Sequence, residues 1–275
     1  MPYLNVHHQP LPFSLRYLSS LLSYRHLCWK LVGSDLRNRF RRTKLGLLWA
    51  FIQPLAFALM IALVWGALHK DLGYWGYALY FLSGITIFEA LSAATMGGQD
   101  ALIQSAGYLR QAEIPLFIFQ MRVSLTAMVY LLFETTTVFV FAAAIGQIPP
   151  VGPHLLLIPV FFVFVWLFTT GTVVLMSIVG AYFRDLKHIA ALVMRALMLL
   201  SPVMLPREIF QEPQLKFMDY LNPLVPLLDM FRDPIIYGRG WEIQDVVVLS
   251  IWIVGIWAAA VIASVSVGRR VMFAI

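Results

Sequence analysis

The sequence predicts an all-α, polytopic membrane protein that crosses the bilayer six times. Hydrophobic residues make up 60% of its 275 residues and charged residues only 12%, whereas a soluble domain carries roughly 25% charged residues. Several nearly uncharged runs reach the ~20 residues that a helix needs to cross the hydrocarbon core. A cluster of cations stands directly before the first of these runs. We therefore expect a single transmembrane domain over residues 1–275 and no separate soluble domain.

The N-terminal region predicts a cytoplasmic tail, residues 1–20, followed by an amphipathic interface helix, residues 21–45. Apolar side chains recur along this helix at steps of three and four, which places them on one stripe. The stripe consists of Trp29, Val32, Leu36 and Phe40. A neighbouring basic face consists of Lys30, Arg37, Arg41 and Lys44. Because a cationic flank is retained on the cytoplasmic side of a membrane, this helix fixes the direction of the spans that follow.

Six spans are predicted to form a bundle over residues 47–268. They are residues 47–68, 77–98, 123–146, 155–181, 189–205 and 246–268. The fifth of them is short. Most Lys and Arg residues fall in segments that would be cytoplasmic if both termini lie inside. This bias predicts an N-in, C-in topology with residues 269–275 as a cytoplasmic C-terminus.

Residues 206–242, between the fifth and sixth spans, are predicted to form short re-entrant helices at the outer face. The segment is too long for a turn and too apolar for a soluble domain, and five prolines interrupt residues 206–234. Helices that dip into the outer leaflet would form an external gate over an exit. The candidate gate residues are Ile209, Phe210, Phe217, Tyr220 and Asn222.

Charged residues within the spans are the first candidates for a transport path. A charged group in hydrocarbon is costly and normally faces a bundle interior or a wet cavity. The alternative is that Arg195 pairs with a glutamate and joins two helices. Aromatic rings could present apolar faces to sugars in a conduit, or could contact lipid. The channel-lining candidates are Glu89, Glu134, Arg195, Tyr130, Phe133 and Trp166.

No catalytic or metal-binding pattern occurs in the sequence. A GxxxxGK[ST] phosphate loop, an HExxH zinc motif and a GxSxG elbow are all missing from it. We therefore predict no catalytic residue, no metal ligand and no cofactor bound by this chain, and a membrane-embedded transferase is the less favoured alternative. The net charge of +6 lies against hydrophobic spans, which indicates anionic lipid headgroups or an acidic protein partner and not nucleic acid.

A compact charged turn ends the fourth span. It consists of Arg184, Asp185, Leu186, Lys187 and His188. One interpretation is a simple positive-inside turn. The other is a rigid knob that a soluble partner receives.

Three motifs occur in order along nearly the whole chain. The first is RFRRTKLGLLWA at 39–50, which runs into Gln53-Pro54. The second is YFRDLKH at 182–188, and the third is LNPL at 221–224 with MFRD at 230–233. Together they resemble the transmembrane subunit of polysaccharide-exporting ABC transporters, the group that exports O-antigen, capsule and teichoic acid.

This resemblance implies a channel-forming half-transporter of the bacterial inner membrane. Two copies would form a homodimer, and two separate ATPase subunits would bind ATP and Mg²⁺ and hydrolyse the ATP. The ATPases would contact the N-terminal amphipathic helix and the turns at 101–115, which includes Arg110, and at 184–188. The substrate would be a polysaccharide or an undecaprenyl-diphosphate-linked glycan. Capsule, teichoic acid, small lipids or drugs are alternative substrates on the same scaffold.

In such a half-transporter the basic face would lie at the lateral entrance for the lipid-linked substrate. Guanidinium and ammonium groups suit a pyrophosphate, and plain binding of anionic membrane lipids is the alternative. The residues proposed for this contact are Arg37, Arg41 and Lys44.

Overall fold

The computed structural model describes residues 15–41, 43–68, 72–111, 114–147 and 151–274, and these residues form helices and connecting turns without a strand. The long helices are α1 (Leu15–Phe40), α2 (Trp49–Leu68), α3 (Gly73–Asp100), α5 (Leu116–Ala144), α6 (Leu157–Tyr182) and α10 (Ile243–Ala274). The shorter ones are η2 (Gly46–Leu48), α4 (Ala106–Gln111), η3 (Pro153–Leu156), α7 (Leu186–Leu199), η4 (Arg207–Gln211), α8 (Met218–Leu221), α9 (Leu224–Arg232) and η5 (Asp233–Tyr237). The start of the predicted tail, residues 1–14, lies outside the described part of the chain.

Five segments among the described residues are long and apolar enough to cross a membrane, in agreement with a polytopic all-α protein. They are Gly46–Ala67, Gly73–Asp100, Leu116–Ala144, Pro153–Tyr182 and Ile243–Ser266. The predicted fifth span, 189–205, falls on α7 and the turn after it. At about 1.5 Å per residue, the 14 residues of α7 give it a length of about 21 Å, less than the ~30 Å hydrocarbon core. A sixth crossing and its orientation therefore remain predictions.

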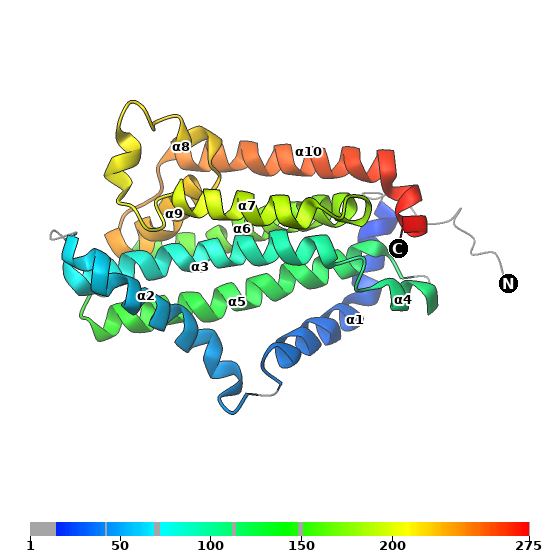
Figure 1. Ribbon diagram of the computed structural model, residues 1–275, viewed down its shortest axis with the longest axis horizontal. Helices are drawn as coiled ribbons and strands as arrows, with labels where there is room; N and C mark the ends of the chain where they lie inside the picture. Colours follow the sequence, from blue (N-terminus) through cyan, green and yellow to red (C-terminus); the bar gives the residue numbers. More distant parts are fainter. Residues whose placement is uncertain (1–14, 42, 69–71, 112–113, 148–150, 275) are drawn as a thin grey trace.

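Apart from the junction of α1 and α2, the connections between the labelled helices gather at two ends of the bundle (Figure 1). One end holds α4, the turn between α6 and α7, and the end of α10. The other end holds η4, α8, α9 and η5. The alternation of inner and outer segments in the predicted topology requires this grouping.

Helix α3 is the centre of the bundle, because it packs against α2, α5, α6, α7 and α9. It is buried along most of its length, whereas α2 and α10 leave most of theirs exposed. Glycines let α3 and α6 approach closely. A Cβ atom at Gly180 would lie 2.9 Å from the carbonyl oxygen of Gln99, and one at Gly98 would lie 3.0 Å from the Cα of Val173. Real Cβ atoms essentially never approach to less than 3.0 Å, so position 180 needs glycine, and a methyl group at position 98 would require the backbone of α6 to shift.

Buried polar contacts join α5 to α6 inside the bundle. The side-chain amide of Gln120 donates to the hydroxyl of Ser177 over 2.7 Å, and the hydroxyls of Ser124 and Thr170 are 2.7 Å apart. Buried hydroxyls and amides in a membrane protein require partners of this kind, since lipid offers none. They fix the relative register of the two helices.

The amphipathic helix is present, but its apolar face differs from the prediction. Helix α1 begins and ends before the predicted limits of 21 and 45. Among its described side chains Cys28, Leu31 and Val32 are buried, and Cys28 and Leu31 belong to a cluster with residues of α5. Trp29, assigned to the apolar stripe, is 56% exposed. The stripe is rotated because α1 packs on α5 and pairs its Asp35 with Arg122 of that helix.

Candidate functional site

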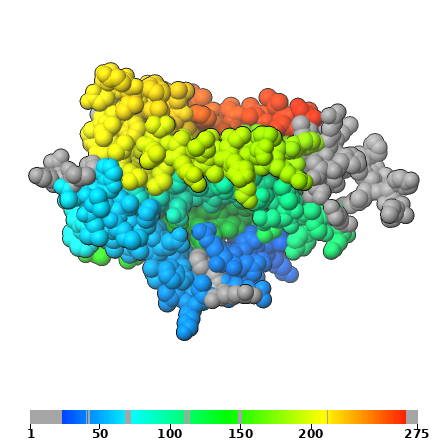
Figure 2. Space-filling model, in the orientation of Figure 1, coloured from blue at the N-terminus to red at the C-terminus, as the bar shows by residue number. Residues whose placement is uncertain are grey.

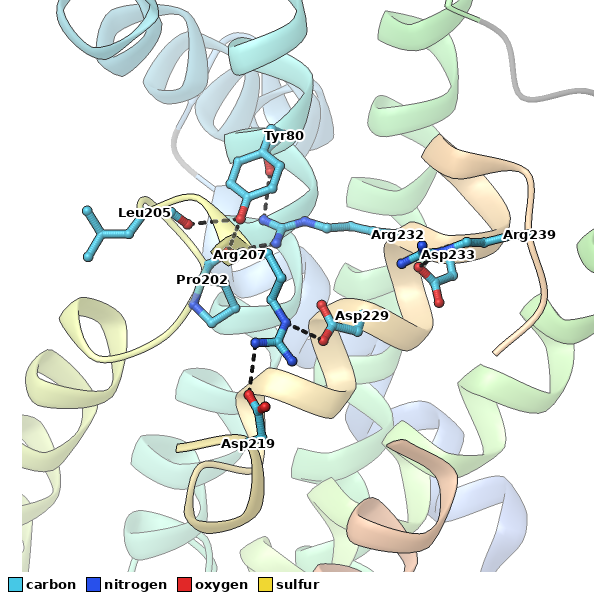
Figure 3. Close-up of polar contacts among 9 residues, drawn as sticks. All are labelled: Tyr80, Pro202, Leu205, Arg207, Asp219, Asp229, Arg232, Asp233 and Arg239. Carbon is cyan, nitrogen blue, oxygen red and sulfur yellow. Dashed lines mark hydrogen bonds and ion pairs between the residues drawn. The ribbon is translucent and has the colours of Figure 1, made fainter. Parts of the chain in front are cut away.

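Residues 201–242, here called the cap segment, cover one end of the bundle with short helices (Figure 1). This observation agrees with the predicted short helices between the fifth and sixth spans. The cap segment carries three arginines that lie in an ordered polar network with carboxylates and carbonyl groups (Figure 3). The contacts of these arginines decide how the cap is held on the bundle.

Arg232, at the end of α9, is the most deeply placed of the three, with 1% of its surface exposed. Its guanidinium donates to the hydroxyl of Ser83 (3.0 Å) and to the carbonyl oxygens of Pro202 (2.6 Å) and Tyr80 (2.9 Å). It also lies 3.7 Å from the centroid of the Tyr80 ring. Arg232 therefore joins α9, the turn after α7 and the central helix α3.

Helix α3 also holds the turn after α7 directly. The Tyr80 hydroxyl lies 3.0 Å from the carbonyl oxygen of Pro202 and 2.9 Å from that of Leu205, and its single proton is shared between them. The Tyr77 hydroxyl donates to the carbonyl of Met204 over 2.7 Å. A turn without regular structure keeps its carbonyl groups satisfied in this way. The cap is thus fixed to α3 through backbone acceptors.

Arg207, on η4, bridges two carboxylates of the cap segment. Its Nη1 lies 2.8 Å from Asp219 and its Nε 2.7 Å from Asp229. Burial would lower the pKa of Arg207, but the two carboxylates outweigh this effect and raise it. Burial raises the pKa of Asp229, against the opposing effect of the Arg207 guanidinium. This pairing lets η4, α8 and α9 pack together despite their charges.

The last part of the cap is closed by an ion pair between Asp233 and Arg239. Asp233 is 1% exposed and accepts from Nε of Arg239 over 2.8 Å. Burial raises the pKa of Asp233, while Arg239 acts in the opposite direction. Between them Gly238 has a φ of 63°, a left-handed conformation that glycine adopts without strain. The chain reverses there and leads into α10.

The candidate gate residues do not form one cluster. Ile209, Phe217 and Tyr220 are exposed. Phe210 and Asn222 are buried, and Asn222 donates to the carbonyl oxygen of Leu200 and the hydroxyl of Ser201, both over 2.7 Å. Phe210 and Asn222 therefore support the cap from inside, and the other three candidates lie on its surface.

Four of the six channel-lining candidates meet at the middle of the bundle. Glu89 on α3 is half-buried and Glu134 on α5 is buried, and the two carboxyl groups lie close enough to affect each other electrostatically. The rings of Tyr130 and Phe133 on α5 lie 6.5 Å apart edge to face. The guanidinium carbon of Arg39, from α1, lies 4.3 Å from the Tyr130 ring centroid.

The other two candidates lie elsewhere. Arg195 is exposed on α7, and the ion pairs of the described residues do not join it to a glutamate. The alternative interpretation, in which Arg195 pairs with one of the two glutamates, is therefore wrong. Trp166, on α6, packs partly buried against the hydrophobic core.

The charged turn after α6 lies at the end of the bundle opposite to the cap (Figure 1). Most of its side chains are exposed, and Leu186 is half-buried. Lys187 lies 3.2 Å from Asp100 at the end of α3, which ties the turn to the central helix. The aromatic rings of Tyr182 and Phe183 are exposed beside it. Arg110 belongs to α4, and its side chain lies outside the described part.

The basic face lies where α1 and α2 meet. The side chains of Arg37, Arg41 and Lys44 are exposed there. In Figure 1, α1 and α2 meet in a V that points away from the rest of the bundle. Among the described residues, no group of three or more His, Cys, Asp or Glu side chains is arranged to hold a metal ion.

Comparison with known proteins agrees with this architecture. The family model described as ABC-2 type transporter matches residues 26–236. The chain is 25% identical over 262 residues to the O-antigen export system permease protein RfbA of Myxococcus xanthus, covering 94% of this chain and 98% of that protein. It is 20% identical over 226 residues to RfbA of Klebsiella pneumoniae, covering 82% and 84% of the two chains.

A further relative is the polysialic acid transport protein KpsM of Escherichia coli. It is 21% identical over 208 residues, which cover 74% of this chain and 79% of KpsM. These matches confirm the resemblance that the three sequence motifs indicate. Because the family model matches well over half of its length, the chain belongs to the ABC-2 type transporter family.

Proposed function

We propose that this chain is the multi-pass permease subunit of a polysaccharide exporter in the bacterial inner membrane. The observation that carries the proposal is the family match over residues 26–236, together with relatives named for O-antigen export and polysialic acid transport over most of the chain. Five helices of spanning length support its place in the membrane. The energy would come from ATP hydrolysed on a separate ATPase subunit, because the sequence has no phosphate loop of its own.

The exposed turn at 184–188 would receive that ATPase. Its attachment through Lys187 and Asp100 to α3 favours this role, since α3 continues to the other end of the bundle and there carries Tyr80, which contacts the cap. A push on the turn would therefore reach the cap through one rigid helix. We also propose that two copies of the chain enclose the conduit, with two ATPases below them.

Substrate would enter at the basic face and leave beneath the cap segment. The exposed cations Arg37, Arg41 and Lys44 suit the pyrophosphate of an undecaprenyl-diphosphate-linked glycan. In this scheme the exposed residues Ile209, Phe217 and Tyr220 of the cap border the exit. The O-antigen class is favoured by the two relatives named RfbA.

Two measurements test the proposal. The chain and the ATPase encoded beside it should co-purify, and Asp185→Arg should abolish the complex. The matched charge reversal Glu212→Arg, on the exposed surface of the cap, should leave it intact. ATP hydrolysis by the isolated chain, or a complex insensitive to Asp185→Arg, would contradict the proposed coupling.

Deletion of the chain should also make lipid-linked glycan accumulate inside the cell, measured by extraction of undecaprenyl-linked polymer. Restoring the gene should clear the accumulated polymer. Sensitivity to drugs without such accumulation would favour a small-molecule exporter on the same scaffold.

A further inference from the structure

We infer that the ion pair between Asp35 on α1 and Arg122 on α5 is the clamp that holds the amphipathic helix on the bundle and so positions its basic face. The consequence for transport rests on the proposed function: a clamped α1 keeps the cations of the basic face beside the bundle, where the phosphate of a lipid-linked substrate can reach them. Asp35 and Arg122 are thus positioning residues and do not themselves bind the substrate.

Two hydrogen bonds form this pair and make it directional. Nε of Arg122 donates to Oδ2 of Asp35, and Nη2 donates to Oδ1 of the same carboxylate. A guanidinium that binds both oxygens of a carboxylate fixes its orientation as well as its distance, which the point charge of a lysine does not do. The Arg122 and Asp35 side chains are 18% and 23% exposed, so salt and water screen the pair less than they screen a fully exposed one.

The clamp lies at the place where the packing of α1 changes. Before it, Cys28 and Leu31 are buried in the hydrophobic cluster shared with α5. After Val32, none of residues 33–39 is buried, so this part of α1 is held by polar contacts. Its other contact with α5 is the Arg39 guanidinium, whose carbon lies 4.3 Å from the centroid of the Tyr130 ring.

Of the two polar contacts, the ion pair is the stronger. Arg39 is exposed, and a cation over an aromatic ring at an exposed site contributes little. Charge-assisted, bidentate hydrogen bonds are about twice as strong as neutral ones. The position of the end of α1 therefore depends mainly on Asp35 and Arg122.

The basic face begins directly behind the clamp. Arg37, two residues after Asp35, is rotated from it by about 200° at 100° per residue. Because Asp35 faces α5, Arg37 points away from that helix, and its side chain is exposed. Figure 2 shows the surface hollowed beside α1 and α2, with green atoms of α5 behind them. Loss of the clamp would let the basic face move away from this hollow.

Cys28 reports the state of the clamp without any transport assay. It is the single cysteine of the chain, it is 5% exposed, and its Sγ lies 4.0 Å from the carbonyl oxygen of Ile118 on α5. A maleimide reaches this thiol when α1 leaves α5, so the labelling rate in lipid nanodiscs measures the population of the released state. Asp35→Asn, which removes the charge that binds Arg122, should raise that rate about tenfold.

The change of charge near the thiol does not imitate this result. Burial raises the pKa of Cys28, and the Arg122 guanidinium acts in the opposite direction. Without that cation the thiolate fraction is smaller, so charge alone would slow the labelling. Arg122→Gln should nevertheless label faster, because α1 is released. The matched control Arg25→Gln, at an exposed position of the same helix, should leave the rate unchanged.

Exchanging the two charges separates the clamp from a general loss of stability. The double variant Asp35→Arg/Arg122→Asp forms the pair with opposite polarity and should label nearly as slowly as the unmodified protein. Arg122→Asp alone, which carries the same new carboxylate on α5, should label fast. An unchanged rate in Asp35→Asn, or a double variant as fast as Arg122→Asp alone, would overturn the inference.

Export distinguishes this inference from the proposed function. If both hold, Asp35→Asn reduces glycan export and the charge exchange restores it, whereas Arg37→Gln reduces export without faster labelling of Cys28. If the chain exports no glycan, the labelling rates still decide whether the ion pair clamps α1. Slow labelling of the double variant without restored export would retain the clamp and overturn its link to substrate entry.

Discussion

Arginine side chains in this protein are bonded in three different ways. Arg232 donates to backbone carbonyls and a hydroxyl, Arg207 bridges two carboxylates, and Arg39 lies on an aromatic ring beside two glutamates. The planar guanidinium, with five N–H donors, suits all three arrangements. Arg232 and Arg39 contact helices that are far apart from them in the sequence, whereas Arg207 joins neighbouring elements of the cap segment.

Removing the Arg232 guanidinium should destabilise the protein strongly. Arg232→Met keeps a long apolar side chain but leaves buried acceptors on Ser83, Pro202 and Tyr80 without this donor. We expect a loss of about 3 kcal/mol in the free energy of unfolding, measured by denaturation in detergent. Lys216→Met, at an exposed position of the same segment, should change it by less than about 0.5 kcal/mol. Equal effects of the two variants would contradict the assigned role.

The cost of losing Arg207 should depend on pH. Asp229 has a pKa above its ordinary value of 3.8 because it is buried, and in Arg207→Ala that pKa rises further, since the neighbouring cation is gone. The folded variant then binds a proton more tightly than the unfolded chain does, so lowering the pH favours the folded state. We expect a melting temperature well below that of the unmodified protein at pH 8 and a smaller difference at pH 5. A difference that grows on acidification would refute this assignment.

Close packing of α3 against α6 sets the width of the bundle. Gly180→Ala would place a methyl group 2.9 Å from the carbonyl oxygen of Gln99, so the helices must separate. We expect a loss of about 1–3 kcal/mol in unfolding free energy. Gly255→Ala is the matched control, because no heavy atom lies within 4 Å of a Cβ at that position; it should be neutral or slightly stabilising. Thermal unfolding in detergent compares the two.

Hydropathy predicted the elements well where burial in lipid alone decides the structure. The predicted spans at 47–68 and 246–268 overlap α2 and α10, which are apolar on most sides. The predicted apolar face of α1 was wrong at Trp29, because packing against α5 decides which side of that helix is buried. Periodicity within one helix carries no information on the partner that will cover it.

The sequence allowed several residues of the candidate site to be named, but it did not predict most of the contacts between them. The sequence named Glu89 and Glu134 as charged groups within the spans and Tyr130 as an aromatic candidate for the same lining, and the structure places Tyr130 one helical turn from Glu134 on α5, with Glu89 on the neighbouring helix α3. It did not indicate the contact of Arg232 with Tyr80, which joins positions 152 residues apart. The available signal in the sequence was the position of Arg232, which follows mostly apolar residues of α9. Burying an arginine there costs too much free energy unless buried acceptors bind its guanidinium.

At the scale of the whole molecule, the two ends of the bundle differ in kind. One end is tied by the exposed pair Lys187–Asp100 and carries exposed cations, whereas the other is closed by the largely buried network of the cap. The N-in, C-in topology expected from the positive-inside rule stays a prediction.

Cysteine accessibility tests that topology. In a Cys28→Ser background, Arg184→Cys and Val151→Cys lie in exposed turns at opposite ends of the bundle. We expect a membrane-impermeant maleimide to label Val151→Cys in spheroplasts, and Arg184→Cys only after the membrane is opened. Labelling of both from outside would refute the N-in, C-in prediction.

The bonding of Arg232 has a genetic consequence. Two of its three hydrogen-bond acceptors are main-chain carbonyls, at Pro202 and Tyr80, and a codon change cannot delete a main-chain oxygen. Second-site mutations that suppress the loss of Arg232 should therefore occur at the few side chains that border its guanidinium. These positions include Ser83 and Gly84; a Cβ at Gly84 would lie 2.7 Å from the guanidinium. A Cβ at Gly84 would also lie 3.0 Å from the carbonyl oxygen of Val203, so large residues should remain harmful there and suppression should favour Ser83.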